Sequence, residues 1–308
     1  EKGEWQVFPE PRPNLEVRIG AILALERLAR NNLDIHVQIM EILCAYIREN
    51  APSSGAKPVA LWKMHEKGPL REDWEARRDV LRAQHHSDKA DLKPRQDVQV
   101  ALTVLGRRSD QGRLWEARHN SSDSEAEFIF DNLGSESLKS DANGPIDGKK
   151  FNDWETKRRN YNGYRLDLRN ANLQWVDLSD LNLEAVRFQG TQLQGADLGG
   201  AHLQGANLNG AHLQGAYLSE AAFDANTILM DTIFKFVAVK KVDFTKVPQI
   251  RDHLSMLFGD ASTRLPHGIN APDHWPKFNL DWDEFEKEWN KWKADPDTYV
   301  PPDPLPRT

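Results

Sequence analysis

The hydrophobic pattern of this chain is dominated by a run in which a large apolar residue recurs at every fifth position, within residues 164–244. A spacing of five fits neither the 3.6-residue period of a helix nor the two-residue period of a strand. It predicts a coil that turns a corner once per repeat and points one large side chain inward each time. The predicted core of this solenoid is Leu168, Leu173, Leu178, Leu183, Phe188, Leu193, Leu198, Leu203, Leu208, Leu213, Leu218 and Phe223.

Small residues occupy two further positions of most repeats. Ala stands two positions before most of the inward residues and leaves room for them at the axis. Gly stands two positions after the inward residue in six consecutive repeats, where a corner needs a residue that tolerates unusual backbone angles. These predicted corner residues are Gly190, Gly195, Gly200, Gly205, Gly210 and Gly215.

The repeat register weakens after Phe223. Ile228 and Ile233 keep the spacing of five, whereas Phe244 is one residue out of phase. We therefore expect residues 225–245 to form an irregular final coil.

The segment ADLGG-AHLQG-ANLNG-AHLQG-AYLSE, at residues 196–220, resembles the A(D/N)LXX pattern of pentapeptide repeat proteins. The resemblance implies a right-handed quadrilateral β-solenoid, with one repeat on each side and four repeats in each coil. Residues 164–245 would then form about four coils. Helical segments are expected on both sides of this solenoid, so the fold class is α+β.

Helix-type spacing of apolar residues precedes the repeats, in residues 1–110, which we expect to form an α-helical domain. Helices are predicted near 15–31, 34–50, 73–84 and 95–106. The first two form a helical hairpin. The apolar face of the second is predicted to contain Ile35, Ile39, Ile42 and Ile47, widened by Met40, Leu43 and Tyr46.

The regions on either side of the solenoid differ in character. Residues 111–163 are polar, and we expect a partly disordered linker there. Residues 246–308 are expected to hold C-terminal capping helices and a Pro-rich tail. One helix is predicted over 248–258, closed by Gly259. A second is predicted over 281–295, with aromatic residues three or four apart.

Several of these stretches together resemble a bacterial group of pentapeptide repeat proteins. They are LEVRIGAILALERLAR, IMEILCAYIRENAP, DVQVALTVLGRR, the repeats, and LFGDASTRLPHGINAPDHW. In that group a helical segment precedes the repeats, and a tail ending in a His-Trp pair follows them. Some members carry transmembrane helices ahead of the helical segment. The residues given contain no such span and begin at Glu1 rather than Met, which is consistent with a fragment or processed form.

Composition limits the class of protein. The 308 residues carry a net charge of -7, which argues against nucleic-acid binding driven by bulk charge. Cys44 is the only cysteine, so no internal disulfide is possible and a reducing compartment is favoured. We expect a cytoplasmic protein, or one on the cytoplasmic side of a membrane if an anchor lies outside these residues. Because Cys44 lies in an apolar run, a buried and inert thiol is expected.

The sequence offers few candidates for a metal or acid–base site. His202 and His212 are ten residues apart, which places them on opposite sides of a four-sided coil. Asp177 and Asp197 are twenty apart and should stack at a backbone spacing of ~4.8 Å, but on a flat, solvated surface. The cluster His85-His86-Asp88 lies in a polar loop.

Motifs for nucleotide binding and for a serine nucleophile are also missing from the sequence. We therefore predict no enzyme activity, no catalytic residue, no metal site and no cofactor.

The function favoured by the sequence is that of a protein–protein interaction scaffold or accessory subunit, with a partner of unknown identity. A regulatory subunit of a membrane-associated or signalling complex is an alternative. The aromatic residues of the tail are expected to cap the solenoid end or dock along its side, and are candidate partner contacts. Three glutamines are also candidates for an exposed amide ladder on one side. The candidate partner-binding residues are Trp275, Trp282, Phe285, Trp289, Trp292, Gln174, Gln194 and Gln214.

A second alternative is mimicry of DNA, because some pentapeptide repeat proteins resemble a duplex and bind type II topoisomerases. A rod of ~19 Å is expected here. DNA carries one charge per ~1.7 Å, so a mimic of that length needs on the order of ten uncompensated acids. The middle coils instead carry mainly Gln, Asn, His and Gly, so this alternative is less favoured.

Overall fold

The computed structural model describes residues 14–57, 94–119, 128–129, 153, 156–157 and 160–303. The predicted helix at 73–84 and the cluster His85-His86-Asp88 lie outside the described residues.

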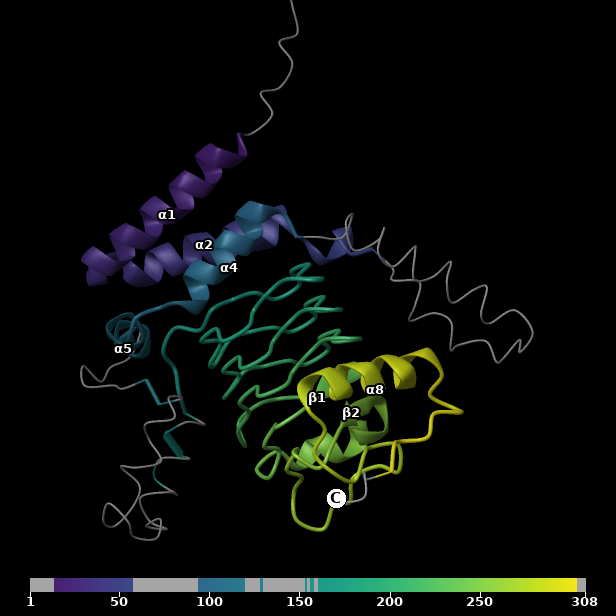
Figure 1. Cartoon of the computed structure of the whole chain (residues 1–308). Helices are drawn as coiled ribbons and strands as arrows, with labels where there is room; N and C mark the ends of the chain where they lie inside the picture. Colours follow the sequence, from purple (N-terminus) through teal and green to yellow (C-terminus); the bar gives the residue numbers. More distant parts are fainter. Residues whose placement is uncertain are drawn as a thin grey trace, which may run out of the picture.

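Three helices lie over one end of the solenoid (Figure 1). They are α1 (Leu15–Asn31), α2 (His36–Asn50) and α4 (Gln96–Gly106). Helix α1 packs on both α2 and α4. Short 3₁₀ turns, η1 (Leu33–Ile35) and η2 (Ser53–Gly55), precede and follow α2.

The apolar face of α2 differs from the prediction. Met40, Leu43 and Cys44 lie on its buried face together with Ile39 and Ile47. Ile35 and Ile42, by contrast, are 38% and 53% exposed, so their assignment to the core face was wrong. Ile35 lies in the 3₁₀ turn before α2, and Ile42 lies on the exposed face of the helix.

The thiol of Cys44 is buried, as expected. Burial raises its pKa to about 11, although a hydrogen bond with Tyr164 opposes this rise. At neutral pH the side chain is therefore a protonated thiol with little nucleophilic character.

A further helix, α5 (Asp110–Arg118), occupies the start of the region predicted to be a linker. Its first turn is capped by Ser109, whose hydroxyl accepts a hydrogen bond from the amide of Gly112 at 3.1 Å. It contacts α2 and buries Glu116 and Ala117. The expectation of a linker from 111 onward was therefore wrong for 111–118, where buried ionic contacts hold a predominantly polar helix in place.

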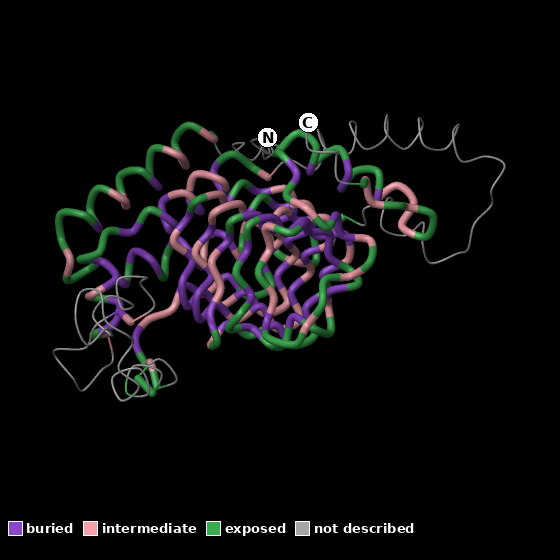
Figure 2. The backbone as a smooth tube through the Cα atoms, turned by 60° about the horizontal axis from the view of Figure 1, so that its bottom comes forward, coloured by how far each residue is buried: buried purple, intermediate pink, exposed green. Residues whose placement is uncertain are grey.

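In the repeat region each side of a coil pairs with the side one full coil later. Parallel bridges join residues twenty apart, for example Asn172 with Gln192 and Asp177 with Asp197. The predicted inward residues from Leu168 to Leu218 are at most 1% exposed, and only Phe223 is half-buried. Figure 2 shows buried positions alternating with intermediate and exposed ones around the coils.

The corners adopt the left-handed backbone conformation that the glycines predicted. The six repeat glycines have φ between +64° and +67°. In other coils a side-chain-bearing residue takes the same position, as at Asn170, Trp175 and Ala185. Such residues accept φ near +60° at a cost of about 1–2 kcal/mol each, so the register of the fold decides the corner conformation.

One residue is inserted into the ladder after Ala222. Bridges join His202 with Ala222, twenty residues apart, but Asn207 with Ile228, twenty-one apart. Beyond the insertion the inward residues, each at most 1% exposed, are Leu229, Phe234, Val239 and Phe244. Ile228 therefore lies outward, and so does Ile233.

This register corrects two predictions. Ile228 and Ile233 do not continue the inward positions, and Phe244 is in phase with the shifted repeat. Residues 228–244 form a regular coil after a single inserted residue, because Leu229 and its successors restore the spacing of five.

The ladder also continues past the predicted boundary at residue 245. Strand β1 (Val237–Val239) pairs in parallel with β2 (Leu257–Gly259), and Asp243 bridges Arg264. The predicted helix at 248–258 is instead the 3₁₀ segment η5 (Pro248–Met256). Gly259 lies within β2 and closes no helix, because the chain returns to the ladder at Leu257.

The last described helix, α8 (Trp282–Ala294), lies against the side of the solenoid near its C-terminal end (Figure 1). Asp281 caps it, accepting a hydrogen bond from the amide of Glu284 at 2.8 Å in a capping box. Two acidic residues in the first turn and two lysines in the last complement the helix dipole.

The corner glycines provide a first test. Replacing Gly210 with Ala should reduce the free energy of unfolding by about 1–2 kcal/mol, because φ is +64° but space for a Cβ is open. Gly195→Ala should cost more, because its Cβ would lie 2.5 Å from the ring of Trp175. Urea unfolding of both variants checks the order, and equal losses would contradict the steric part of the argument.

Candidate interaction surfaces

The N-terminal edge of the solenoid is sealed by the helical segment. The amide of Asn172 donates to the carbonyl of Ala51 at 2.6 Å, and that of Asn182 donates to the carbonyl of Gly106 at 3.0 Å. On the side between them, the amide of Asp177 donates to Oε1 of Gln99 at 3.0 Å. On three sides of the first coil, the backbone amides that face the open end of the solenoid are thus hydrogen-bonded to elements that precede the coil.

Close packing accompanies these hydrogen bonds. A Cβ on Gly106 would lie 2.6 Å from the side chain of Leu181, so the end of α4 approaches the coil as only Gly allows. Buried residues of α2, α4 and the coils form one continuous apolar cluster. The helices and the solenoid therefore share a core.

A buried ionic network joins α2 and α5 to the solenoid. Glu116 accepts from Nε2 of His36 at 3.0 Å and pairs with Nε of Arg108 at 3.0 Å. On the solenoid, Glu184 pairs with Nη1 of Arg113 at 3.1 Å and lies 3.3 Å from Nδ1 of His202. Each of these glutamates is 2% exposed or less.

The charges of this network stabilise the contact between α5 and the solenoid. Burial alone would raise the pKa of Glu184, but the hydrogen bond with His202 and the charges of Arg108 and Arg113 lower it on balance. A carboxylate whose pKa is lowered in this way stays ionised and is a poor proton acceptor, and the neighbouring arginines neutralise its charge. The contacts fix α5 against the first coils.

The C-terminal edge is closed by the His-Trp pair of the tail. Nε1 of Trp275 and Nε2 of His274 lie 2.8 and 2.7 Å from the carbonyl oxygen of Leu257 in β2. The indole of Trp275 is fully buried and rests on Gly259, where a Cβ would lie 2.6 Å from the ring. A backbone carbonyl of the last coil is thereby satisfied.

A buried lysine attaches the tail to the side of the last coil. Nζ of Lys240 lies 2.6 Å from Oδ2 of Asp260 and donates to the carbonyl of Leu280 at 2.6 Å. The rings of Trp282 and Phe285 lie 5.3 Å from the same ammonium group. Asp260 also accepts a hydrogen bond from the amide of Leu280 at 3.0 Å.

The aromatic stripe of α8 faces the solenoid, which confirms the prediction that it docks along the side. Nε1 of Trp289 donates to the carbonyl of Phe236 at 3.0 Å, and Trp292 packs against Phe236 and Phe258. These rings form an apolar cluster with Phe285. Trp292 also stacks on His274 at 4.9 Å, which links this side contact to the end closure.

The candidate partner-binding residues are mostly turned inward. Trp275, Phe285, Trp289 and Trp292 are buried within the chain, and Trp282 alone among these five aromatics is exposed, at 40%. Their packing in this structure is intramolecular.

The expectation of an exposed glutamine ladder was wrong for two of its three members. Gln174 is buried, and its amide pairs with both backbone groups of Lys57. Gln194 is also buried, and Gln214 is half-buried. These side chains lie at coil corners beside the backbone, where the long amide folds back instead of pointing into solvent.

The two His side chains and the two Asp side chains lie as their spacing predicted. His202 bridges Asn182 and Ala222, whereas His212 bridges Gln192 and Ile233, so the two belong to different sides. Asp177 and Asp197 stack on one side, and burial, with the charge of Asp177, raises the pKa of Asp197. Within the described part of the chain no three His, Cys, Asp or Glu side chains group together as a metal site.

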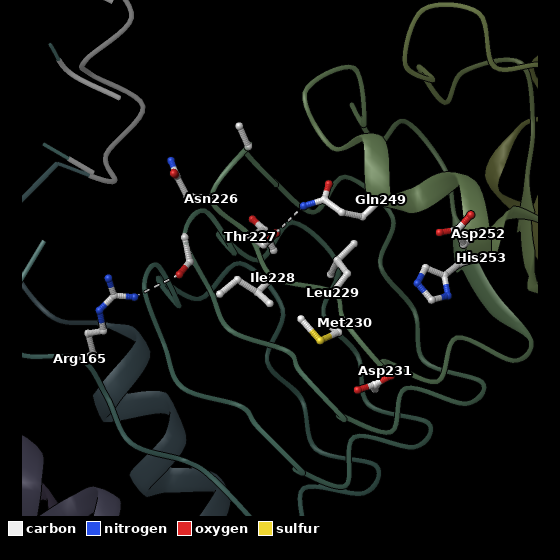
Figure 3. Close-up of a pocket in the computed structure, with 12 residues that line it drawn as sticks. Arg165, Asn226, Thr227, Ile228, Leu229, Met230, Asp231, Gln249, Asp252 and His253 are labelled. Carbon is white, nitrogen blue, oxygen red and sulfur yellow. Dashed lines mark hydrogen bonds between the residues drawn. The ribbon is translucent and has the colours of Figure 1, made fainter. Parts of the chain in front are cut away.

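A recess of about 740 Å³ lies at the inserted residue (Figure 3). Ile228 and Met230 lie on its floor, and Asp231, Asp252 and His253 lie at one side. Arg165 lies at the other side, where Nη1 is 3.5 Å from the carbonyl of Gly205. This recess was not predicted from the sequence, although the five-residue spacing that restarts at Leu229 marks its position.

This geometry defines the chain as a β-solenoid protein with both ends closed by its own flanking segments. Its residues 167–205 and 196–225 match the family model of pentapeptide repeats, with eight copies. Residues 167–225 of the chain are therefore a run of pentapeptide repeats. No curated protein sequence matches it significantly.

Solved structures of pentapeptide repeat proteins are similar to parts of the chain. One from the Arabidopsis thaliana thylakoid lumen is 23% identical, covering 37% of this chain and 70% of its own, with a TM-score of 0.23. QnrB1, a plasmid-mediated fluoroquinolone resistance protein, is 12% identical, covering 44% and 75%, with a TM-score of 0.21. One from the cyanobacterium Cyanothece 51142 is 29% identical, covering 33% and 61%, with a TM-score of 0.13.

None of the helices described here combines the length and the apolar character needed to span a bilayer.

The Lys240–Asp260 pair can be compared with its exposed neighbour, Lys241–Glu220. Asp260→Asn should reduce the free energy of unfolding by about 3 kcal/mol, because it leaves the ammonium of Lys240 buried without a counter-charge. Glu220→Gln should cost less than about 1 kcal/mol, since both partners are half-exposed. Denaturant unfolding measures both losses, and tryptophan fluorescence reports whether α8 detaches. A loss for Asp260→Asn no larger than for Glu220→Gln would contradict the anchoring role.

The end closure should depend on pH through His274. Burial lowers the pKa of this imidazole, and the charge of Lys277 adds to the effect, against a hydrogen bond to Leu257 that raises it. The unfolded chain therefore binds the proton more readily, and stability should fall as pH drops below about 6.5. Urea midpoints between about pH 7.5 and 5.5 should decrease, and His274→Gln should flatten this slope.

The matched control is His267→Gln, at an exposed histidine on the neighbouring loop. An equal flattening in both variants would contradict the assignment to His274. His212 and His253, whose pKa values burial also lowers, account for the slope that remains.

Proposed function

We propose that this protein is a non-catalytic scaffold for protein–protein interactions, built on a right-handed quadrilateral solenoid of about four coils. The observation that carries the proposal is the closure of both ends. Ala51, Gln99 and Gly106 occupy the first edge, and Trp275 occupies the last. Backbone groups occupied in this way are not available to an added strand, so other molecules meet the side faces of the solenoid and the outer faces of its flanking helices.

Rigidity supports the same proposal. The side faces are outward positions of a ladder whose inward residues are close to fully buried. A partner that binds such a surface does not have to order it, so less conformational entropy is lost on association.

The charges favour a scaffold over a mimic of DNA. Asp167 pairs with Arg169 and Arg48, and Glu184 pairs with Arg113. Near the C-terminal end, Asp243 pairs with Arg264 and Glu220 with Lys241. Acids that are neutralised within the chain do not present the continuous negative potential of a phosphate backbone. An assay of gyrase supercoiling with neither inhibition nor protection is the expected result.

The test of the scaffold proposal is capture of partners by the intact chain from extracts of its native host, followed by reconstitution from purified components. We expect a defined protein complex. We also expect its affinity to fall about tenfold or more when one outward face is changed without loss of stability.

Two matched face variants are suitable. One changes Gln192 and His212 to Glu on the solenoid side, and the other changes Val17 and Leu28 to Glu on the exposed face of α1. The scaffold function would be refuted if no captured protein binds again after reconstitution. It would also be refuted if substitutions on these and the other exposed faces leave the complex unchanged.

A further inference from the structure

Two adjacent sides of the solenoid change from polar to apolar at the same coil. On the first, the bridged outward residues run Asp167, Arg187 and Asn207 before Ile228. On the second, they run Asn172, Gln192 and His212 before Ile233. Met230 lies between the two isoleucines in the sequence, at the corner that joins these sides. We call Ile228, Met230 and Ile233 the apolar corner.

The apolar corner is not covered by the described part of the chain. Ile228 is 41% exposed, Met230 62% and Ile233 37%. The third side changes in the same direction, from Asp177 and Asp197 to Tyr217, Ala238 and Phe258, but there the rings of α8 cover it. The chain thus buries one apolar side of its last coils and leaves the neighbouring corner open.

The charges around the open corner are predominantly acidic. Asp231 and Asp252 line the recess beside Ile228 and Met230 (Figure 3), and neither forms an ion pair with a residue that the structure describes. The guanidinium of Arg165, across the recess, is directed to the carbonyl of Gly205 and lies 5.3 Å from the ring of Tyr161. An incoming segment therefore meets an apolar floor with two carboxylates on one side and the guanidinium of Arg165 on the other.

We propose that the apolar corner and its recess bind a short segment of another protein in which apolar side chains lie next to Lys or Arg. The segment places its apolar side chains over Ile228 and Met230, and its cationic groups reach Asp231 and Asp252. The recess of about 740 Å³ accommodates a few side chains of such a segment. This inference rests on the proposed scaffold function and assigns one of its binding sites.

The experiment uses the full chain and three labelled synthetic peptides of equal length: one rich in Leu and Lys, one in Leu and Glu, and one in Gln and Lys. Fluorescence anisotropy should show the Leu–Lys peptide binding at least about tenfold more tightly than either of the others. Its affinity should fall as salt is added, because the carboxylates contribute through charge.

Substitutions locate the binding. Replacing Ile228 and Met230 together with Gln should weaken the Leu–Lys peptide by about tenfold or more. Replacing Asp231 and Asp252 with Asn should weaken it less and remove most of the salt dependence. All four side chains lie at the surface, so these variants should stay folded, which circular dichroism verifies. The control is Val17→Gln with Leu28→Gln, the same apolar-to-polar change on α1, and it should have no effect.

Several outcomes would overturn the proposal. They are equal binding of the Leu–Glu peptide, unchanged affinity in the corner variant, and equal loss in the α1 control. Self-association abolished by the corner variant would assign the surface to a second copy of the chain. Binding to anionic vesicles abolished by it would assign the surface to a membrane. If a reconstituted partner remains bound to the corner variant, this site is wrong but the scaffold function stands. If no partner exists, the scaffold function itself fails.

Discussion

An unpaired row of backbone groups at each end of the coil stack is the constraint on which the rest of this structure depends. Within the stack every coil satisfies the next, but the first and last coils each expose donors and acceptors along one edge. The chain meets this constraint by different means at its two ends. Carbonyls and an amide side chain of the helical segment accept from Asn172, Asp177 and Asn182 at the first edge. Indole and imidazole groups donate at the last edge.

The closures account for features that a repeat alone does not require. Gly106 ends α4 where the helix must approach Leu181. Gly259 has no side chain, which leaves room for the indole of Trp275 to pack on it. The buried pair of Lys240 and Asp260 then holds the segment that follows Trp275 against the side. Burial of such a pair requires good geometry to offset desolvation, which the carbonyl and amide of Leu280 supply. Flanking segments that look like appendages in the sequence are thus parts of one cooperative unit.

Much of the repeat architecture could be predicted, because its information is local. An inward Leu, a small Ala and a corner Gly within five residues determine one side of a coil, and φ near +65° at the glycines agrees with the prediction. What the sequence hid was a change of register. Ile228 and Ile233 continue the spacing of five from Phe223 and are apolar, so the sequence looks like an unbroken repeat. Because one residue is inserted near Asp224, both in fact lie outward.

Helix type was harder to predict where tertiary contacts outweigh periodicity. Residues 248–258 have helical spacing, but Leu257 and Gly259 are recruited by a parallel partner strand one coil earlier. Residues 110–118 are too polar to be recognised as a packed helix, because their burial depends on His36 and Glu184, both far away in the sequence. Contacts of that range leave no periodic trace in the local sequence.

The same reasoning explains which candidate sites could be recognised. Aromatic residues at helical spacing predicted a helix with one apolar face, and in the structure that face packs on the solenoid. The open apolar corner lacked such a signal, because two isoleucines and a methionine in a repeat look like core residues until the register is known.

The position of the insertion ties stability to recognition. The inserted residue is accommodated by Asp224, whose carboxylate accepts from the amides of Gly205 and Asn226 and from the hydroxyl of Thr227. These hydrogen bonds hold the loop, so the shifted ladder beyond it is as regular as the ladder before it. In the register that follows the insertion, Leu229 and Phe234 point inward, and the residues just before them, Ile228 and Ile233, lie outward and form the apolar corner with Met230. The surface of this coil is therefore set by the apolar residues that stand directly before its inward residues, and the insertion keeps these residues in line with the outward positions of the coil before.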